Sequence, residues 1–127
     1  MSEKTQIRNL ARVLAILNVE QGSYHYIDKI SQTVSRSLAM YYIREALRDY
    51  ASLTQRGFET KAAREAAQYV NFLELEKEIE MIRSMEDVSA LREELSAIAA
   101  QALAEAGKIR YFEARKEGTG EVQAVSG

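Results

Sequence analysis

Apolar residues recur every three or four positions along most of this chain, which is the spacing of one face of an α-helix. The first stripe of this kind consists of Ile7, Leu10, Leu14 and Leu17. It predicts a helix from about Thr5, an acceptable cap, to Glu20. Gly22 is expected to end that helix, because glycine adopts the left-handed conformation that commonly follows a helix.

Two further helices are predicted between Ser23 and Gly57. Ser23 is a plausible N-cap for a short helix from Tyr24 to Val34, and a longer helix starts at Ser35 or Ser37 and reaches Gln55. The longer one has a core stripe of Ala39, Ile43, Ala46, Tyr50 and Leu53. The side away from that stripe carries Tyr41, Arg44, Arg48 and Gln55. The chain should therefore contain two helices joined by a short serine-rich turn.

A longer helix is predicted from Thr60 to about Ser84, with a change of pattern partway along it. One face carries Ala62, Ala66, Tyr69, Val70 and Leu73, and nearly the opposite face carries Phe72, Leu75, Ile79 and Ile82. The helix must therefore change packing partners near Phe72. Either it bends there, or its two halves pack against different elements, one of which can belong to another subunit.

Residues 73–82 also fit a second secondary structure. Apolar and charged residues alternate through most of this segment, which is typical of a half-buried strand. Glutamate and lysine favour helices over strands, and the residues upstream are rich in alanine. We therefore predict a helix here, with a strand as the alternative.

The next helix should begin after Asp87 and end at Gly107. Its apolar stripe consists of Val88, Leu91, Leu95, Ile98, Ala102 and Ala106. Its other side carries Ala90, Ala97, Ala100 and Ala104. Such a smooth surface permits close approach by a second helix, although the high helix propensity of alanine explains the composition equally well.

Residues 108–127 are predicted to form a β-hairpin, because residues 109–115 and 121–125 are typical of strands and the glycines Gly118 and Gly120 of a turn. Such a hairpin should dock on the helices or on a partner, and the alternative is a frayed tail from Gly118. The predicted fold is thus mainly α, a compact bundle of about five helices over residues 1–107 with a small C-terminal β-hairpin.

Composition narrows the function classes. A chain of 127 residues suits one domain, and the shares of 46% hydrophobic and 28% charged residues are those of a globular protein. The absence of cysteine excludes disulfides and thiolate metal sites, and a single histidine excludes the common zinc ligand sets within one chain. We expect no cofactor. The absence of a signal-like or membrane-spanning apolar run predicts a cytoplasmic protein without membrane contact.

Candidates for catalysis are weak. His25 has Asp28 three residues further on, a spacing that suits a base oriented by a carboxylate, but no nucleophile is marked beside them. The glutamates at positions 74, 76, 78 and 80 resemble a metal cluster, yet Lys77 and Arg83 are placed to pair with Glu74 and Glu80 on a solvated helix face. There is no phosphate-binding glycine motif. We predict that the protein is not an enzyme.

Charge is uneven along the chain. Residues 1–72 hold ten Lys/Arg against seven Asp/Glu, and residues 73–127 hold seven against twelve. The candidate nucleic-acid-binding residues are Arg36, Tyr41, Arg44, Arg48, Arg56, Lys61 and Arg64. The arginine fork suits phosphate, and the tyrosine offers a stacking surface. An ordinary solvated surface is the alternative interpretation.

Three segments resemble a known family. Residues 14–17 (LAIL), 22–30 (GSYHYIDKI) and 42–51 (YIREALRDYA) are similar to the small-subunit family of archaeal type I-A CRISPR Cascade complexes, over about the first half of the chain. The resemblance implies a non-catalytic helical subunit with other Cascade subunits, guide RNA and target DNA as partners. Such a subunit contacts the backbone subunits and stabilises the hybrid of guide and target or the displaced strand. It also leaves self-association open.

Two other functions fit parts of the pattern. Residues 24–34 and 36–55 can form the helix-turn-helix of a DNA-binding regulator with the hairpin as its wing, although two helices would separate the wing from the recognition helix. A helical scaffold or toxin-neutralising partner without nucleic-acid contact is the other alternative. With a net charge of −2, the chain should bind nucleic acid only weakly, locally and with strong salt dependence.

Overall fold

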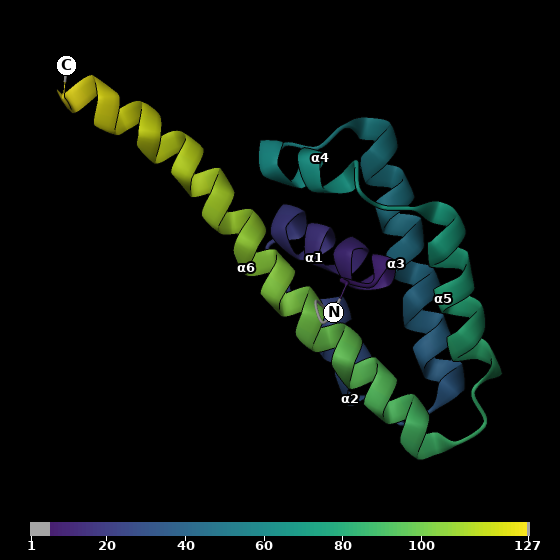
Figure 1. Ribbon diagram of the computed structural model, residues 1–127. Helices are drawn as coiled ribbons and strands as arrows, with labels where there is room; N and C mark the ends of the chain where they lie inside the picture. The colour runs from purple at the N-terminus through teal and green to yellow at the C-terminus, as the bar shows by residue number, and fades with distance from the viewer. Residues whose placement is uncertain (1–5, 127) are drawn as a thin grey trace.

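The computed structural model describes the backbone of residues 6–126 and the side chains of residues 6–115 (Figure 1). Its elements are α1 (Asn9–Gln21), α2 (His25–Gln32), α3 (Arg36–Arg56), α4 (Lys61–Ala67), α5 (Phe72–Ser84) and α6 (Val88–Ser126). The prediction of a mainly helical fold is confirmed. The described part of the chain contains six helices, where about five were predicted, and no strand.

Local signals set several helix ends as predicted. Gly22 ends α1 with a φ of 66°, and its N–H donates to the carbonyl of Asn18 over 2.8 Å. Ser35 caps α3 by accepting from the N–H of Leu38, and Gly57 follows that helix with a φ of 97°. Asp87 precedes α6 and accepts from the N–H of Ser89 over 3.0 Å. The predicted cap at Thr5 lies outside the described residues.

The predicted helix over residues 60–84 is two helices. Residues 68–71 separate α4 from α5, and the side chain of Asn71 accepts from the N–H of Glu74 over 3.0 Å. Asparagine is among the best N-cap residues, so it starts a new helix in a new direction where the apolar face changes. The alternative of a strand over residues 73–82 is wrong, because α5 covers all of them.

The predicted C-terminal hairpin is also wrong, since α6 continues without interruption from Val88 to Ser126. Ile109, which is only 3% exposed, extends the buried stripe of this helix past Gly107. Arg110 donates to the side chain of Asn18, and Glu113 accepts from the N–H of Ala62. These tertiary contacts stabilise the helical conformation of residues 108–115 and outweigh the strand propensity of isoleucine, tyrosine and phenylalanine.

The core surrounds α1, which contacts each of the other five helices. Every residue from Leu10 to Asn18 except Arg12 is buried, so this helix is enclosed on nearly all sides and does not rest on one apolar stripe. Figure 1 shows α1 between α6 on one side and α3 with α5 on the other. Among the described residues, no helix combines the length and apolar character needed to span a membrane.

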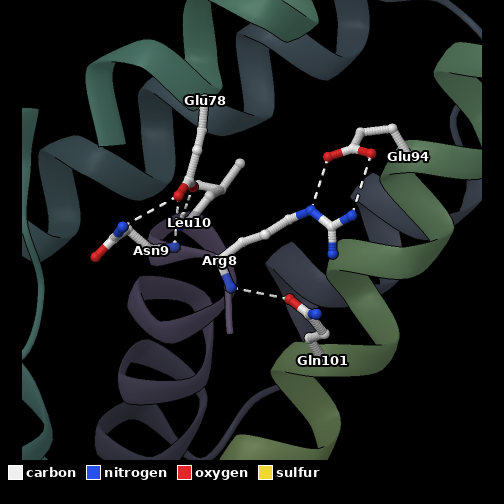
Figure 2. Close-up of polar contacts among 6 residues, drawn as sticks. All are labelled: Arg8, Asn9, Leu10, Glu78, Glu94 and Gln101. Carbon is white, nitrogen blue, oxygen red and sulfur yellow. Dashed lines mark hydrogen bonds and ion pairs between the residues drawn. The ribbon is translucent and has the colours of Figure 1, made fainter. Parts of the chain in front are cut away.

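The N-terminus of α1 is capped by a side chain from another helix. The N-cap residue Arg8 offers no side-chain cap of its own. Instead, the carboxylate of Glu78 in α5 accepts from the backbone N–H groups of Asn9 and Leu10 over 2.9 and 2.8 Å (Figure 2). Arg8 forms an ion pair with Glu94 of α6 over 2.8 Å, and its N–H donates to Gln101. Two distant helices thus fix where α1 begins.

Two alanine substitutions distinguish a glycine inside a helix, Gly107 of α6, from a glycine that ends one, Gly22 after α1. Gly107 is exposed, and a Cβ added there meets nothing within 4 Å, so Gly107→Ala should raise the free energy of unfolding by about 1 kcal/mol. Gly22→Ala should instead lower it by about 1 kcal/mol or more, because its φ of 66° strains any L side chain. Urea denaturation followed by circular dichroism measures both. A destabilising Gly107→Ala would show that the helix ends at this glycine.

Candidate nucleic-acid interface

The outer side of α3 carries three of the predicted site residues together. Tyr41, Arg44 and Arg48 lie within about 60° of one another around the helix at 100° per residue, opposite the buried stripe. Tyr41 is 50% exposed and the side chain of Arg48 is 75% exposed. The guanidinium of Arg48 lies 3.5 Å from Glu45, while Arg44 has no such partner among the described residues. This side therefore presents a ring and two accessible guanidinium groups.

The other four predicted residues are not part of that group. Arg36 and Arg56 lie at opposite ends of α3, about 30 Å apart, and Lys61 and Arg64 belong to α4. Arg36 donates to the carbonyl of Met85 over 2.8 Å, and Arg64 donates to the carbonyl of Phe58 over 3.0 Å. Arg36 therefore binds the residue that follows α5, and Arg64 binds the loop that follows α3. Arg36, Arg56, Lys61 and Arg64 are all exposed.

Residues from α2 extend the surface around Tyr41. The ring of His25 lies 6.2 Å from that of Tyr42, and the rings of Tyr41 and Tyr42 are 5.2 Å apart, both edge-on. The amine of Lys29 lies 6.0 Å above the ring of Tyr42. We call these four residues, together with Tyr26, Arg44 and Arg48, the α2–α3 surface. Sequence spacing did not reveal His25, Lys29 and Tyr42, because only the packing of α2 on α3 brings them beside Tyr41.

Tyr26 holds the two helices of this surface together. Its hydroxyl donates to the carboxylate of Asp49, which also accepts from Gln21 over 3.5 Å. Burial raises the pKa of Tyr26 well above its usual value of 10.0, and the hydrogen bond to Asp49 raises it further. The phenol is therefore neutral at physiological pH and remains a donor, which fixes the position of α2 relative to α3.

Removal of this hydroxyl should weaken the fold in a pH-dependent way. We expect Tyr26→Phe to lower the free energy of unfolding by about 1 kcal/mol at neutral pH. Because the folded-state pKa is raised, this contribution is complete below pH 10.0 and is lost as the pH rises toward the folded value. The difference between wild type and variant should thus shrink above that pH in urea denaturation. Tyr41→Phe, which removes an exposed hydroxyl, is the matched control and should change little.

The surroundings of the α2–α3 surface are close to electrically balanced. Lys29, Arg44 and Arg48 supply positive charge, whereas Asp28, Glu45 and Asp49 lie on the same two helices. Asp49 is engaged by Tyr26 and Gln21, and Glu45 by Arg48. Attraction for a polyanion should therefore be local and sensitive to salt.

In the described part of the chain, His25 and glutamates of α5 make contacts with neighbouring side chains. His25 makes ring contacts with Tyr26 and Tyr42, and no hydrogen bond joins it to Asp28 among the described side chains. In the acidic run, the predicted pairs of Glu74 with Lys77 and of Glu80 with Arg83 are present at 3.7 and 2.6 Å. Glu78 forms no such pair within α5 and instead accepts from the backbone N–H groups at the start of α1. No three potential metal-ligating residues gather in the part of the chain that is described.

A pocket of about 290 Å³ lies between α1, α4 and α6. Its polar groups include Arg12, whose Nε lies 3.4 Å from the carboxylate of Glu105, and Lys108, whose amine lies 3.9 Å from the same carboxylate. Ala62, Ile109 and Phe112 line its apolar part. The charges of Arg12, Lys108 and Glu105 thus largely satisfy one another, and the pocket does not adjoin the α2–α3 surface.

Comparison with known proteins relates the chain to an archaeal protein. No family model and no solved structure matches it. A protein of Archaeoglobus fulgidus, named only as an uncharacterized protein, is 44% identical over 110 residues, which cover 86% of this chain and 95% of that protein. Identity of this level over almost the whole of both chains requires a common fold. The chain therefore belongs to the same protein family as this Archaeoglobus fulgidus protein.

Proposed function

We propose that this chain is a non-catalytic small subunit of an archaeal CRISPR RNA-guided interference complex. In this proposal, it contacts the backbone subunits and stabilises the hybrid of guide RNA and target DNA or the displaced strand. The observation that carries the proposal is the α2–α3 surface, where the exposed Tyr41, Arg44 and Arg48 gather on one side of α3 beside the partly buried Tyr42. Two of the segments that resemble type I-A small subunits, residues 22–30 and 42–51, lie in the α2 and α3 region that builds this surface.

The chemistry of the surface suits contact with a nucleic-acid backbone. The planar guanidinium groups of Arg44 and Arg48 can each donate two hydrogen bonds to a phosphate, and they repel each other at a spacing of four residues unless an anion lies between them. Tyr41 is exposed enough to stack on a base. Such contacts recognise the shape and charge of the nucleic-acid backbone and not its base sequence. This is expected of a protein in a complex where base pairing with the guide RNA selects the target.

The weak nucleic-acid binding that we expect of the isolated chain is compatible with this role. Its net charge is −2, and the cations of the surface have carboxylates nearby. A subunit held in a larger assembly does not need strong affinity, because its partners place it beside the nucleic acid at high effective concentration.

Purification from the native host tests membership of the complex. A tagged chain should bring down guide RNA and other effector subunits, and the same complex should lack it when the gene is deleted. Recovery of the chain alone, or with an unrelated partner, would overturn the proposal.

A charge-removing double variant tests the surface itself. In the assembled complex, Arg44→Ala with Arg48→Ala should weaken target DNA binding by about tenfold or more and lower the slope of log affinity against log salt by roughly one to two. Lys77→Ala with Arg83→Ala on α5 removes the same charge elsewhere and should have little effect. Filter binding at several salt concentrations measures both. Equal losses of target DNA affinity in the two double variants would show that binding depends only on net charge, and would contradict a specific role of the α2–α3 surface.

A helix-turn-helix regulator is the second candidate, because α2 and α3 are joined by a turn of three residues, 33–35. The wing of that hypothesis is absent from the described chain, since its residues belong to α6. A footprint on a defined DNA duplex, lost in the Arg44 and Arg48 double variant, would support the regulator. A scaffold without nucleic-acid contact would instead show no salt-sensitive binding to DNA or RNA.

A further inference from the structure

Hydrogen bonds are incomplete in the pocket between α1, α4 and α6. Glu105 lines this pocket with a side chain that is only 10% exposed, and its carboxylate accepts no hydrogen bond from the described residues. Its ion pairs with Arg12 and Lys108, at 3.4 and 3.9 Å, are longer than the roughly 2.7–2.9 Å of a charge-assisted hydrogen bond. Most buried polar side chains in proteins are hydrogen-bonded, so this carboxylate is an acceptor that still needs donors.

Arg12 has the complementary need for acceptors. Its Nε is shielded from solvent and makes no hydrogen bond. One terminal nitrogen donates to the carbonyl of Tyr69 over 3.4 Å, and the guanidinium makes no other hydrogen bond to the described residues. A guanidinium carries five N–H donors in total. The wall of the pocket therefore holds unused donors directly beside an unused acceptor.

Two exposed aromatic rings line the same pocket. Tyr69, which follows α4, is 70% exposed, and Phe112 of α6 is 51% exposed. The guanidinium carbon of Arg12 lies 5.7 Å from the centre of the Tyr69 ring. The volume of about 290 Å³ is close to the lower end of the range for small-ligand sites, roughly 300–1,000 Å³. The pocket therefore suits one small group that stacks on an aromatic ring.

The chemistry of the lining selects the group that fits. Two cations, Arg12 and Lys108, face two carboxylates, Glu65 and Glu105, so the charges balance and a neutral group is favoured over a phosphate or carboxylate. The group should also be planar, with donors for Glu105 beside an acceptor for Arg12. Guanine meets these requirements, because its N1–H and its exocyclic amine are adjacent donors for the two oxygens of a carboxylate and its O6 is an acceptor for a guanidinium.

We propose that this pocket binds a guanine base, which donates to Glu105, accepts from the terminal nitrogens of Arg12 and stacks on the rings of Tyr69 and Phe112. Adenine, cytosine and uracil offer the carboxylate a single amine or N–H group, so they bind less tightly. The base belongs either to a free guanine nucleotide or to a single strand of DNA or RNA. The pocket does not adjoin the α2–α3 surface, so base binding by the isolated chain does not depend on the function proposed above.

Calorimetric titration of the isolated chain with four nucleoside monophosphates tests the identity of the base. The guanine nucleotide should bind about tenfold or more tightly than the adenine, cytosine and uracil nucleotides. All four carry the same phosphate, so the difference reports the base alone. A chain that binds no guanosine monophosphate at millimolar concentration would overturn the proposal, and so would equal affinities for the four nucleotides.

Oligonucleotides identify the source of the base. The Arg44→Ala with Arg48→Ala variant is used here, so that the α2–α3 surface contributes little to binding. It is titrated with a short oligothymidine that carries one central guanine and with guanosine monophosphate. Tighter binding of the oligonucleotide supports a nucleic-acid strand as the source of the base, and tighter binding of the mononucleotide supports a free nucleotide.

Variants of the lining test the contacts separately. Tyr69→Ala with Phe112→Ala should weaken binding of guanosine monophosphate by about tenfold or more, because both stacking surfaces are lost. Tyr24→Ala with Tyr41→Ala removes two exposed rings outside the pocket and is the matched control, with unchanged affinity expected.

Glu105→Gln keeps the shape of the side chain but replaces one acceptor oxygen with a donor, so the preference for guanine over adenine should be lost. Circular dichroism checks the helix content of each variant. If Glu105→Gln does not fold, the paired aromatic variants decide the question, because their rings are exposed. Equal affinities in the Tyr69 with Phe112 variant and its control would overturn the proposal, and so would a folded Glu105→Gln variant that keeps the full preference for guanine.

Discussion

Glu78→Ala is expected to lower the free energy of unfolding by about 2–3 kcal/mol, because it uncaps the central helix of the fold. The Glu78 carboxylate accepts from the N–H groups of Asn9 and Leu10 and from the amide of Asn9 (Figure 2). Its negative charge also lies at the positive end of the α1 dipole. Without it, two N–H groups at the edge of the core lose their acceptor. Urea denaturation followed by circular dichroism gives the change directly.

Two further variants separate the cap from general charge effects. Glu76→Ala removes an exposed glutamate from the same helix and should change the stability by less than about 0.5 kcal/mol. Glu78→Gln keeps one acceptor oxygen but no charge, so its loss should be intermediate. If the alanine variants at positions 76 and 78 were equally stable, Glu78 would contribute nothing as a cap.

Ile98→Ala is expected to cost about 2–5 kcal/mol, the range for large-to-small changes in a closed core. Ile98 is 0% exposed and lies on the inner side of α6, the helix with the most extensive packing against α1. The substitution removes apolar contacts and leaves a cavity that the neighbouring helices cannot fill without moving. The midpoint of urea unfolding should fall, with the slope unchanged.

The matched control is a truncation at an exposed position. Leu73→Ala removes a similar apolar side chain that is 72% exposed on α5, and it should change the stability by less than about 1 kcal/mol. Similar losses at both positions would contradict the placement of Ile98 in the core. An unchanged Ile98→Ala variant would do the same.

The candidate site was predictable where it depends on one helix. Tyr41, Arg44 and Arg48 share a side of α3, and helical spacing alone places them together. It could not show that α2 adds His25, Lys29 and Tyr42, because these contacts join separate helices. Nor could it show that Arg36 and Arg64 donate to the backbone carbonyls of Met85 and Phe58.

The amino-acid sequence by itself determined the helical class and those helix ends that depend on neighbouring residues. The period of the apolar residues specifies helices, and Gly22, Ser35 and Gly57 act within one turn of their own positions. The continuation of α6 past Gly107 depends on the tertiary structure, because Ile109 becomes buried only when the other helices are in place. The capping of α1 by Glu78 likewise exists only in the folded chain, since it joins residues 69 positions apart.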